Sequence, residues 1–126
     1  MKLVITTKNA PTPIGPYNQA ILKNGMLFTS GQIAIDPQTG ELNLDNIETE
    51  TKLVMENLKA ILTEAGMTFE NVLKSTIFLS DMDNFAAINK VYGSYFKEAT
   101  APARETVQVA RLPKSVNVEI SVIAAL

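Results

Sequence analysis

The chain lacks two residue types on which much enzyme chemistry depends, because its 126 residues include no histidine and no cysteine. A serine–histidine–aspartate triad and a thiolate nucleophile are therefore excluded, and so are the metal sites built on these side chains. The absence of cysteine also excludes a disulfide framework and is compatible with the reducing cytoplasm, where we expect the protein. Any chemistry must come from arginine, carboxylates, hydroxyls and backbone groups, and we expect no metal.

The chain also lacks a large excess of either positive or negative charge. The net charge is −2 and the 11 basic residues are scattered, so nothing in the composition attracts a phosphate backbone. No apolar run is long enough to span a membrane, and the apolar part of Met1–Thr6 is too short for a signal peptide. The glycine spacing contains no phosphate-binding loop. We therefore expect neither nucleic acid nor a membrane among the partners.

The chain does contain enough apolar sequence for a core. Hydrophobic residues make up 46% of the chain, and the length fits one domain over residues 1–126. Period-2 and period-3.6 patterns predict six strands and two helices in the order β-β-β-α-β-α-β-β. The predicted strands are Leu3–Thr6, Tyr17–Leu22, Met26–Ile33, Val72–Leu79, Thr106–Arg111 and Val116–Ala124, and the predicted helices are Ile47–Ala65 and Phe85–Phe96. This order predicts an α+β fold with both helices on one face of a mixed sheet.

Three local signals mark the ends of these elements. Asn24-Gly25 predicts a tight hairpin, since both residues tolerate positive φ. Gly66 is expected to end the first helix, and Asp83 to cap the start of the second.

Two charged residues are candidates for chemistry. Arg104 begins a β-type run after Pro102, and its planar fork of donors matches a carboxylate. Glu119 lies on the polar side of the last strand, where it could activate water. From the residues alone, an ordinary surface arginine and a solvated glutamate are the favoured interpretations. Arg111 is interpreted as structural, because its odd separation from Arg104 predicts the opposite strand face.

Six short segments together resemble the RidA (YjgF) family, the enamine/imine deaminases. They are Asn9-Ala10-Pro11, Ile14-Gly15-Pro16-Tyr17, Thr29-Ser30-Gly31-Gln32, Pro102-Ala103-Arg104, Val109-Ala110-Arg111-Leu112-Pro113-Lys114 and Val118-Glu119-Ile120. Their order and spacing match the family nearly end to end. The resemblance implies a chorismate-mutase-like fold and a homotrimer with sites between subunits.

The resemblance also implies a role for each of seven residues. Arg104 would hold the substrate carboxylate, helped by the Gly31 N–H, and Glu119 would position the attacking water. The backbone carbonyl of Thr106 would accept a hydrogen bond from the imine nitrogen. Many members have cysteine at that position, and the change to threonine excludes thiolate chemistry. Tyr17, Ser30 and Asn89 would line the pocket.

The implied activity is hydrolysis of 2-imino acids such as 2-iminopropanoate and 2-iminobutanoate to 2-oxo acids and ammonia. It would need no cofactor, and it would clear by-products of pyridoxal-phosphate enzymes. Two alternatives stay open: a non-catalytic module that binds small carboxylates or a partner protein, and an endoribonuclease or translation inhibitor. Glu119 favours the enzyme over a carboxylate sensor, and the acidic composition counts against RNA.

Overall fold

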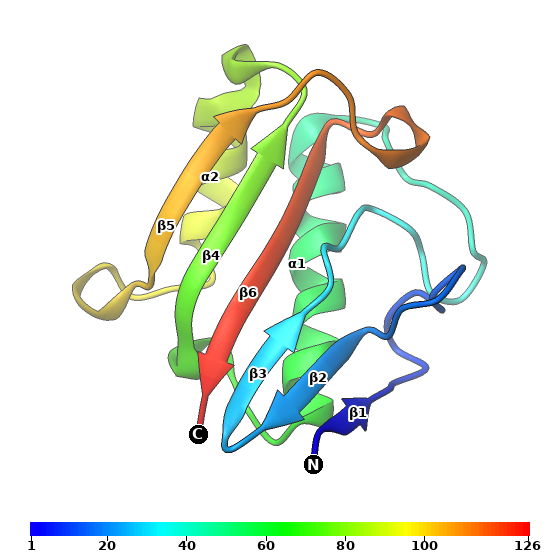
Figure 1. Ribbon diagram of the computed structural model, residues 1–126. Helices are drawn as coiled ribbons and strands as arrows, with labels where there is room; N and C mark the ends of the chain where they lie inside the picture. Colours follow the sequence, from blue (N-terminus) through cyan, green and yellow to red (C-terminus); the bar gives the residue numbers. More distant parts are fainter.

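One mixed sheet with two helices behind it forms the protein, and the computed structural model describes all of residues 1–126 (Figure 1). The sheet has six strands in the order β1-β2-β3-β6-β4-β5. The strands are β1 Leu3–Ile5, β2 Ala20–Lys23, β3 Met26–Thr29, β4 Val72–Leu79, β5 Ala103–Gln108 and β6 Val118–Ala125. All neighbours are antiparallel except β4 and β5, which are parallel. The predicted α+β fold is therefore confirmed.

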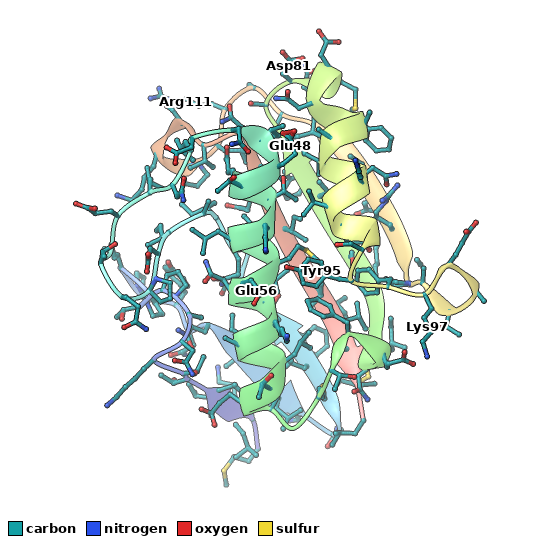
Figure 2. All side chains as sticks on the ribbon, turned by 180° about the vertical axis from the view of Figure 1, so that it is seen from behind. Glu48, Glu56, Asp81, Tyr95, Lys97 and Arg111 are labelled. Carbon is teal, nitrogen blue, oxygen red and sulfur yellow. The ribbon has the colours of Figure 1, made fainter.

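Both helices connect strands across the same face of the sheet. The helix α1 spans Ile47–Glu64 and leads from β3 towards β4, and α2 spans Phe85–Gly93 and lies between β4 and β5 in the chain. Such a crossover is what a parallel strand pair requires. Seen from behind, Tyr95 and Glu56 face each other across the gap between the helices (Figure 2), and the Tyr95 hydroxyl donates to Glu56 Oε2 at 2.7 Å. Neither helix has the length and apolar character that a membrane crossing requires.

Two of the three predicted end signals are confirmed. Asn24 and Gly25 have φ of 52° and 77° in the turn between β2 and β3. Gly66 has φ of +74° just after α1, and its N–H donates to the Thr63 carbonyl at 3.0 Å. Glycine suits this position because a Cβ disfavours the left-handed conformation.

The predicted cap of the second helix is wrong. Asp81, not Asp83, supplies a cap, and its carboxylate accepts the Asp83 N–H at 2.9 Å at the start of a 3-10 turn over Met82–Asn84. That turn leads directly into α2, whose own N-cap residue Asn84 makes no side-chain bond. The helix also ends at Gly93 rather than Phe96, because the next residues bond in the tighter i to i+3 pattern.

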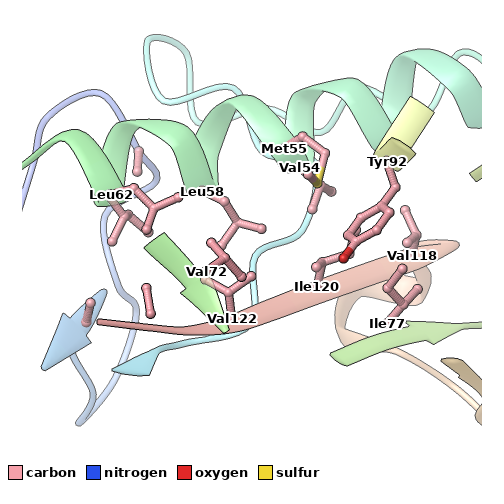
Figure 3. Close-up of a cluster of buried hydrophobic side chains, with 14 of the residues drawn as sticks. Val54, Met55, Leu58, Leu62, Val72, Ile77, Tyr92, Val118, Ile120 and Val122 are labelled. Atoms are coloured by element: carbon pink, nitrogen blue, oxygen red, sulfur yellow. The ribbon is translucent and has the colours of Figure 1, made fainter. Parts of the chain in front are cut away.

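The core lies between α1 and the sheet. Val54, Leu58 and Leu62 of α1 point towards β6, which carries Ile120 and Val122 (Figure 3), and all five side chains are buried. Burying each such side chain contributes about 1.5 to 3 kcal/mol. Residues 118, 120, 122 and 124 of β6 are buried while 119, 121, 123 and 125 are not. This alternation, predicted from the sequence, turns the side chain of Glu119 away from the helices.

The other face of the sheet carries apolar side chains that nothing covers. The strand register aligns Val4, Ile21, Phe28 and Ile123 in one row across four strands on this face. Val4 is 51% exposed and Phe28 is 47% exposed, and Val107 on β5 is 43% exposed. An exposed apolar surface of this kind is typical of an interaction face.

Several strand boundaries differ from the prediction at the site. The strand β5 begins at Ala103 and ends at Gln108, because it pairs with β4 from Lys74 to Leu79. Arg104 therefore lies within the strand, and Arg111 lies beyond it rather than on it. At the other side of the sheet β3 ends at Thr29, so Ser30 and Gly31 follow the strand instead of completing it.

Candidate functional site

A cavity of about 550 Å³ contains four of the predicted site residues. Tyr17 comes from the proline-rich loop before β2, Ser30 and Gly31 from the segment after β3, and Glu119 from β6. Pro113 and Lys114 complete the wall from the turn before β6. Segments distant in the chain thus meet around one carboxylate.

Glu119 is half-buried in this cavity, and burial raises the pKa of its carboxyl above the ordinary value. Gly31 lies directly against it, since a Cβ on Gly31 would stand 2.6 Å from Glu119 Oε2. A bridge between Gln32 and Ile120, with N–H to carbonyl distances of 2.8 and 3.1 Å, holds the two segments together. A carboxylate with a raised pKa is a stronger base than an ordinary glutamate, which suits it to accept a proton.

The loop that carries Tyr17 is held by a residue that the sequence did not single out. Gln19 is buried, and its amide donates to the carbonyls of Thr7, Ala10 and Pro11 while its oxygen accepts the Thr7 N–H at 2.7 Å. Tyr17 itself is 51% exposed and available to a ligand. Pro11 has no N–H and so cannot donate a backbone hydrogen bond to a neighbouring strand. The side chain of Gln19 therefore supplies the hydrogen bonds that hold this loop in place.

Ser30 points its hydroxyl back to its own chain. Its Oγ donates to the Asn18 carbonyl at 2.5 Å, and its N–H donates to the Gln19 carbonyl at 2.8 Å. The oxygen therefore faces a ligand only as an acceptor.

A second cavity, of about 640 Å³, contains Arg104 and Asn89. Arg104 Nη1 donates to Asn89 Oδ1 at 2.6 Å. The guanidinium carbon lies 5.2 Å from the ring centroid of Tyr92 and 5.6 Å from that of Phe85, distances at which cation–π attraction holds an arginine in place. No carboxylate of the chain pairs with it, since the two salt bridges are Lys74–Glu105 and Lys97–Glu70. The remaining donors of Arg104 are free for a carboxylate.

Thr106 lies two residues beyond Arg104 on the same side of β5. Its hydroxyl is buried and has no hydrogen-bond partner. Glu105, between them, faces the other side and pairs with Lys74 at 3.3 Å. Arg111 lies beyond β5 rather than on its opposite face, and it donates from Nε to Ser115 Oγ at 3.2 Å in the loop after β5.

Within one chain, the residues around Glu119 and the residues around Arg104 lie in separate places. The two cavities have no lining residue in common. The strand β4 lies between β5 and β6, and Arg104 faces the helices while Glu119 faces the open side of the sheet. No group of three or more carboxylate, histidine or cysteine side chains is arranged to hold a metal ion. Arg104 and Glu119 can act on one ligand only if two chains meet.

Comparison with known proteins assigns the chain. The family model described as Endoribonuclease L-PSP matches residues 7–126. The chain belongs to the Rid (YjgF/RutC) family. A RutC family protein of Synechocystis is 59% identical over 124 residues, covering 98% of this chain and 95% of the relative. The Escherichia coli protein named "Putative reactive intermediate deaminase TdcF" is 48% identical over 126 residues, covering 98% and 97%.

Solved structures of other Rid-family proteins have the same fold. YyfA of Yersinia pestis matches with a TM-score of 0.97 at 49% identity and covers 100% of both chains. Escherichia coli TdcF with bound serine matches with a TM-score of 0.92 at 45% identity, covering 98% of each chain. The YjgF protein of Escherichia coli matches with a TM-score of 0.91 at 42% identity, again covering 98% of each.

Proposed function

We propose that this protein hydrolyses reactive 2-imino acids, such as 2-iminopropanoate and 2-iminobutanoate, to 2-oxo acids and ammonia. The observation that carries the proposal is the half-buried Glu119 carboxyl, whose pKa is raised by burial, at the wall of a cavity. The relatedness to TdcF supports it, because that protein carries the name "Putative reactive intermediate deaminase" and its structure has been solved with bound serine, a small amino acid. Serine has the carboxylate and the α-nitrogen that a 2-imino acid also has.

The reaction needs little beyond orientation, because a protonated C=N bond is already electrophilic. Arg104 binds the substrate carboxylate, and the Gly31 N–H assists it. Glu119 accepts a proton from water as the water oxygen bonds to the imine carbon and the C=N π electrons move to nitrogen, and it then returns this proton to the nitrogen. The C–N bond breaks to release ammonia, while the hydroxyl proton of the intermediate passes to Glu119 and C=O forms. The Thr106 carbonyl accepts a hydrogen bond from the nitrogen. No cofactor takes part.

Three further residues shape the proposed pocket. Tyr17 packs its ring against the substrate side chain, Ser30 offers an acceptor oxygen, and Asn89 holds the Arg104 fork through the 2.6 Å bond. We propose that the substrates arise as by-products of pyridoxal-phosphate enzymes in the cytoplasm.

We further propose that the protein is a homotrimer with each site shared by two subunits. One subunit supplies Arg104, Asn89 and Thr106, and its neighbour supplies the residues around Glu119. The separation of the two cavities in one chain supports this arrangement. So does the apolar open face with Phe28, 47% exposed, because its burial would supply the free energy of association.

Subunit mixing tests the shared site. Arg104→Ala and Glu119→Gln should each be inactive, but co-refolded trimers should regain activity. Random mixing in equal amounts leaves one intact site in each trimer that contains both variants, so about one quarter of wild-type activity is expected. Light scattering should give a mass of about three times 13.7 kDa. Mixed trimers without activity would show that both residues act within one subunit.

A competition assay tests the reaction itself. Threonine dehydratase generates 2-iminobutanoate, semicarbazide traps it, and the protein should suppress the semicarbazone signal. Arg104→Ala should lose the suppression, while Arg111→Ala, a matched arginine outside both cavities, should keep it. Full suppression by Arg104→Ala would refute the assignment of the carboxylate clamp.

A carboxylate-binding module is the second candidate, favoured by the unpaired Arg104. It predicts that the wild type binds pyruvate or serine in calorimetry without suppressing the semicarbazone signal. The ribonuclease activity that the family description names has less support, because the net charge is −2 and the chain has no histidine.

A further inference from the structure

A buried carboxylate that the proposed reaction does not use lies behind Glu119. Glu50, in the first turn of α1, is 0% exposed. Its Oε2 accepts the Asn117 N–H at 2.7 Å and the Val118 N–H at 3.3 Å, and its Oε1 accepts from Asn117 Nδ2 at 2.7 Å. No lysine or arginine pairs with it. A buried carboxylate is costly unless hydrogen bonds satisfy it, and here all of them come from the two residues before Glu119.

Asn117 is held from a second element as well. The Ser80 N–H, at the end of β4, donates to the Asn117 carbonyl at 3.1 Å, and Ser80 Oγ lies 3.4 Å from Asn117 Oδ1. On the other side of Glu119, Ile120 is bridged to Gln32. The backbone on each side of Glu119 is therefore fixed by contacts from different elements.

These contacts on both sides of Glu119 matter because its carboxyl is closely packed and has little space in which to move. Its carboxyl packs against Gly31 so closely that a single added carbon would stand 2.6 Å from Oε2. A shift of the Asn117–Val118 backbone would move the Glu119 side chain along the cavity wall. Displacement of a catalytic group by about 1 Å can cost about 100-fold in rate.

We infer that Glu50 is a positioning residue for Glu119: by holding the backbone of Asn117 and Val118, it sets where the catalytic carboxylate stands in the cavity. The inference rests on the proposed function for its catalytic consequence. The simpler role, an acidic residue in the first turn of a helix that adds stability, predicts a loss of stability and nothing more.

The surroundings of Glu119 indicate that Glu50 acts on it through the position of the backbone rather than through the charge of the Glu50 carboxylate. The titratable groups that share its cavity are Tyr17 and Lys114, and the register aligns Phe78 of β4 beside it. Glu50 approaches from the helix side of β6, whereas Glu119 faces the open side. A change in the geometry at residue 50 should therefore matter more than a change in its charge.

Two substitutions at Glu50 separate geometry from charge. Glu50→Gln removes the charge but keeps an oxygen at the same reach for the two backbone N–H groups, and the Asn117 amide can rotate to accept from it. Glu50→Asp keeps the charge but is one methylene too short. Glu48→Gln, an exposed residue in the same turn, is the control. For each variant, the hydrolysis of 2-iminobutanoate gives kcat and KM, and carboxyl ¹³C spectra follow the titration of Glu119.

The expected results differ between the variants. Glu50→Gln should retain kcat within about 3-fold, whereas Glu50→Asp should lose about 10- to 100-fold in kcat with KM little changed. In Glu50→Asp the Glu119 titration should move towards that of an ordinary glutamate, because the displaced carboxyl becomes hydrated. Glu48→Gln should match the wild type in every measurement.

Two outcomes would overturn the inference. The first is that Glu50→Asp folds and keeps the wild-type kcat and the wild-type titration of Glu119. The second is that kcat falls in Glu50→Gln but is retained in Glu50→Asp. If Glu50→Asp does not fold, Asn117→Ala takes its place. It removes the Nδ2 bond to Glu50 and the 3.4 Å contact with Ser80 Oγ but keeps both backbone N–H bonds to Glu50, and it should shift kcat and the titration in the same direction. If the wild type hydrolyses no imine, the proposed function fails, and the Glu119 titration still decides the role of Glu50.

Discussion

Replacing Gly31 with alanine should lower kcat by about 10- to 100-fold while leaving the fold intact. The added Cβ would meet Glu119 Oε2 at 2.6 Å, Cδ at 2.7 Å and Cγ at 2.9 Å. Ordinary van der Waals contact begins at 3.4 Å, so Oε2 must retreat by about 0.8 Å from its position. The backbone of Gly31 is not in the left-handed region, so alanine adds no backbone strain there.

The size of the effect follows from which atoms must move. The atoms that the added Cβ meets are all in the half-buried Glu119 side chain and include Cγ. The side chain must therefore rotate about its Cα–Cβ bond, at a cost of about 1 kcal/mol. The same rotation displaces the proposed base by close to 1 Å, which corresponds to about 10- to 100-fold in kcat. We therefore expect a large loss of activity with a small loss of stability.

Gly66→Ala is the matched control. Its φ is +74° and no atom lies within 4 Å of the added Cβ, so alanine should cost about 1 kcal/mol through strain at the end of α1. Its kcat should be unchanged, since Gly66 is outside both cavities. Urea denaturation and the semicarbazone competition assay compare the two variants. Wild-type kcat in folded Gly31→Ala would refute the reasoning.

Three further predictions concern buried polar groups. Thr106→Val should raise the free energy of unfolding by about 1 kcal/mol in urea titrations, because the buried hydroxyl has no partner; an unchanged midpoint would contradict this. Tyr92→Phe should lower it by about 1 to 3 kcal/mol, since the Tyr92 hydroxyl donates to the fully buried Ser75 at 2.8 Å, and Tyr17→Phe, an exposed tyrosine, is the control. Burial raises the pKa of Glu119 above its ordinary 4.5, so its contribution to stability is greatest in acid and is lost as the pH rises through the raised value. Glu119→Gln should therefore melt at a higher temperature than the wild type at neutral pH, and calorimetry should find no such difference below about pH 4.5.

Much of the fold was predictable because its signals are local. The period-3.6 pattern of α1, the Asn24-Gly25 turn and the alternation in β6 each depend on neighbours in the chain. The alternation also predicted that Glu119 faces away from the helix-covered core. The start of β5 was missed by three residues, because its first residues become a strand through pairing with Lys74–Thr76 of β4, and the residues themselves carry little strand signal. The Asp83 cap failed for a similar reason, since a 3-10 turn begun at Asp81 precedes the helix.

The candidate site was predictable only in part. The residues and the family resemblance single out Arg104 and Glu119 as candidates, and the resemblance predicts sites between subunits. Only the tertiary structure places the two side chains in separate cavities of one chain. Gln19 was missed because the sequence predicts it within a strand, Tyr17–Leu22, whereas β2 begins only at Ala20, and no pattern distinguishes this glutamine from a solvated one. Only its burial and its bonds to the proline-rich loop reveal its role.

The sequence by itself predicted the number and order of the helices and strands, the Asn24-Gly25 turn and the absence of histidine and thiol chemistry, because composition and short-range periodicity decide these. The tertiary structure alone decided that β6 inserts between β3 and β4, and that Glu50 meets a backbone N–H 67 residues away. It also decided that Gly31 stands against Glu119. Contacts between distant segments depend on how the whole sheet packs against α1, and no local pattern in the chain encodes that packing.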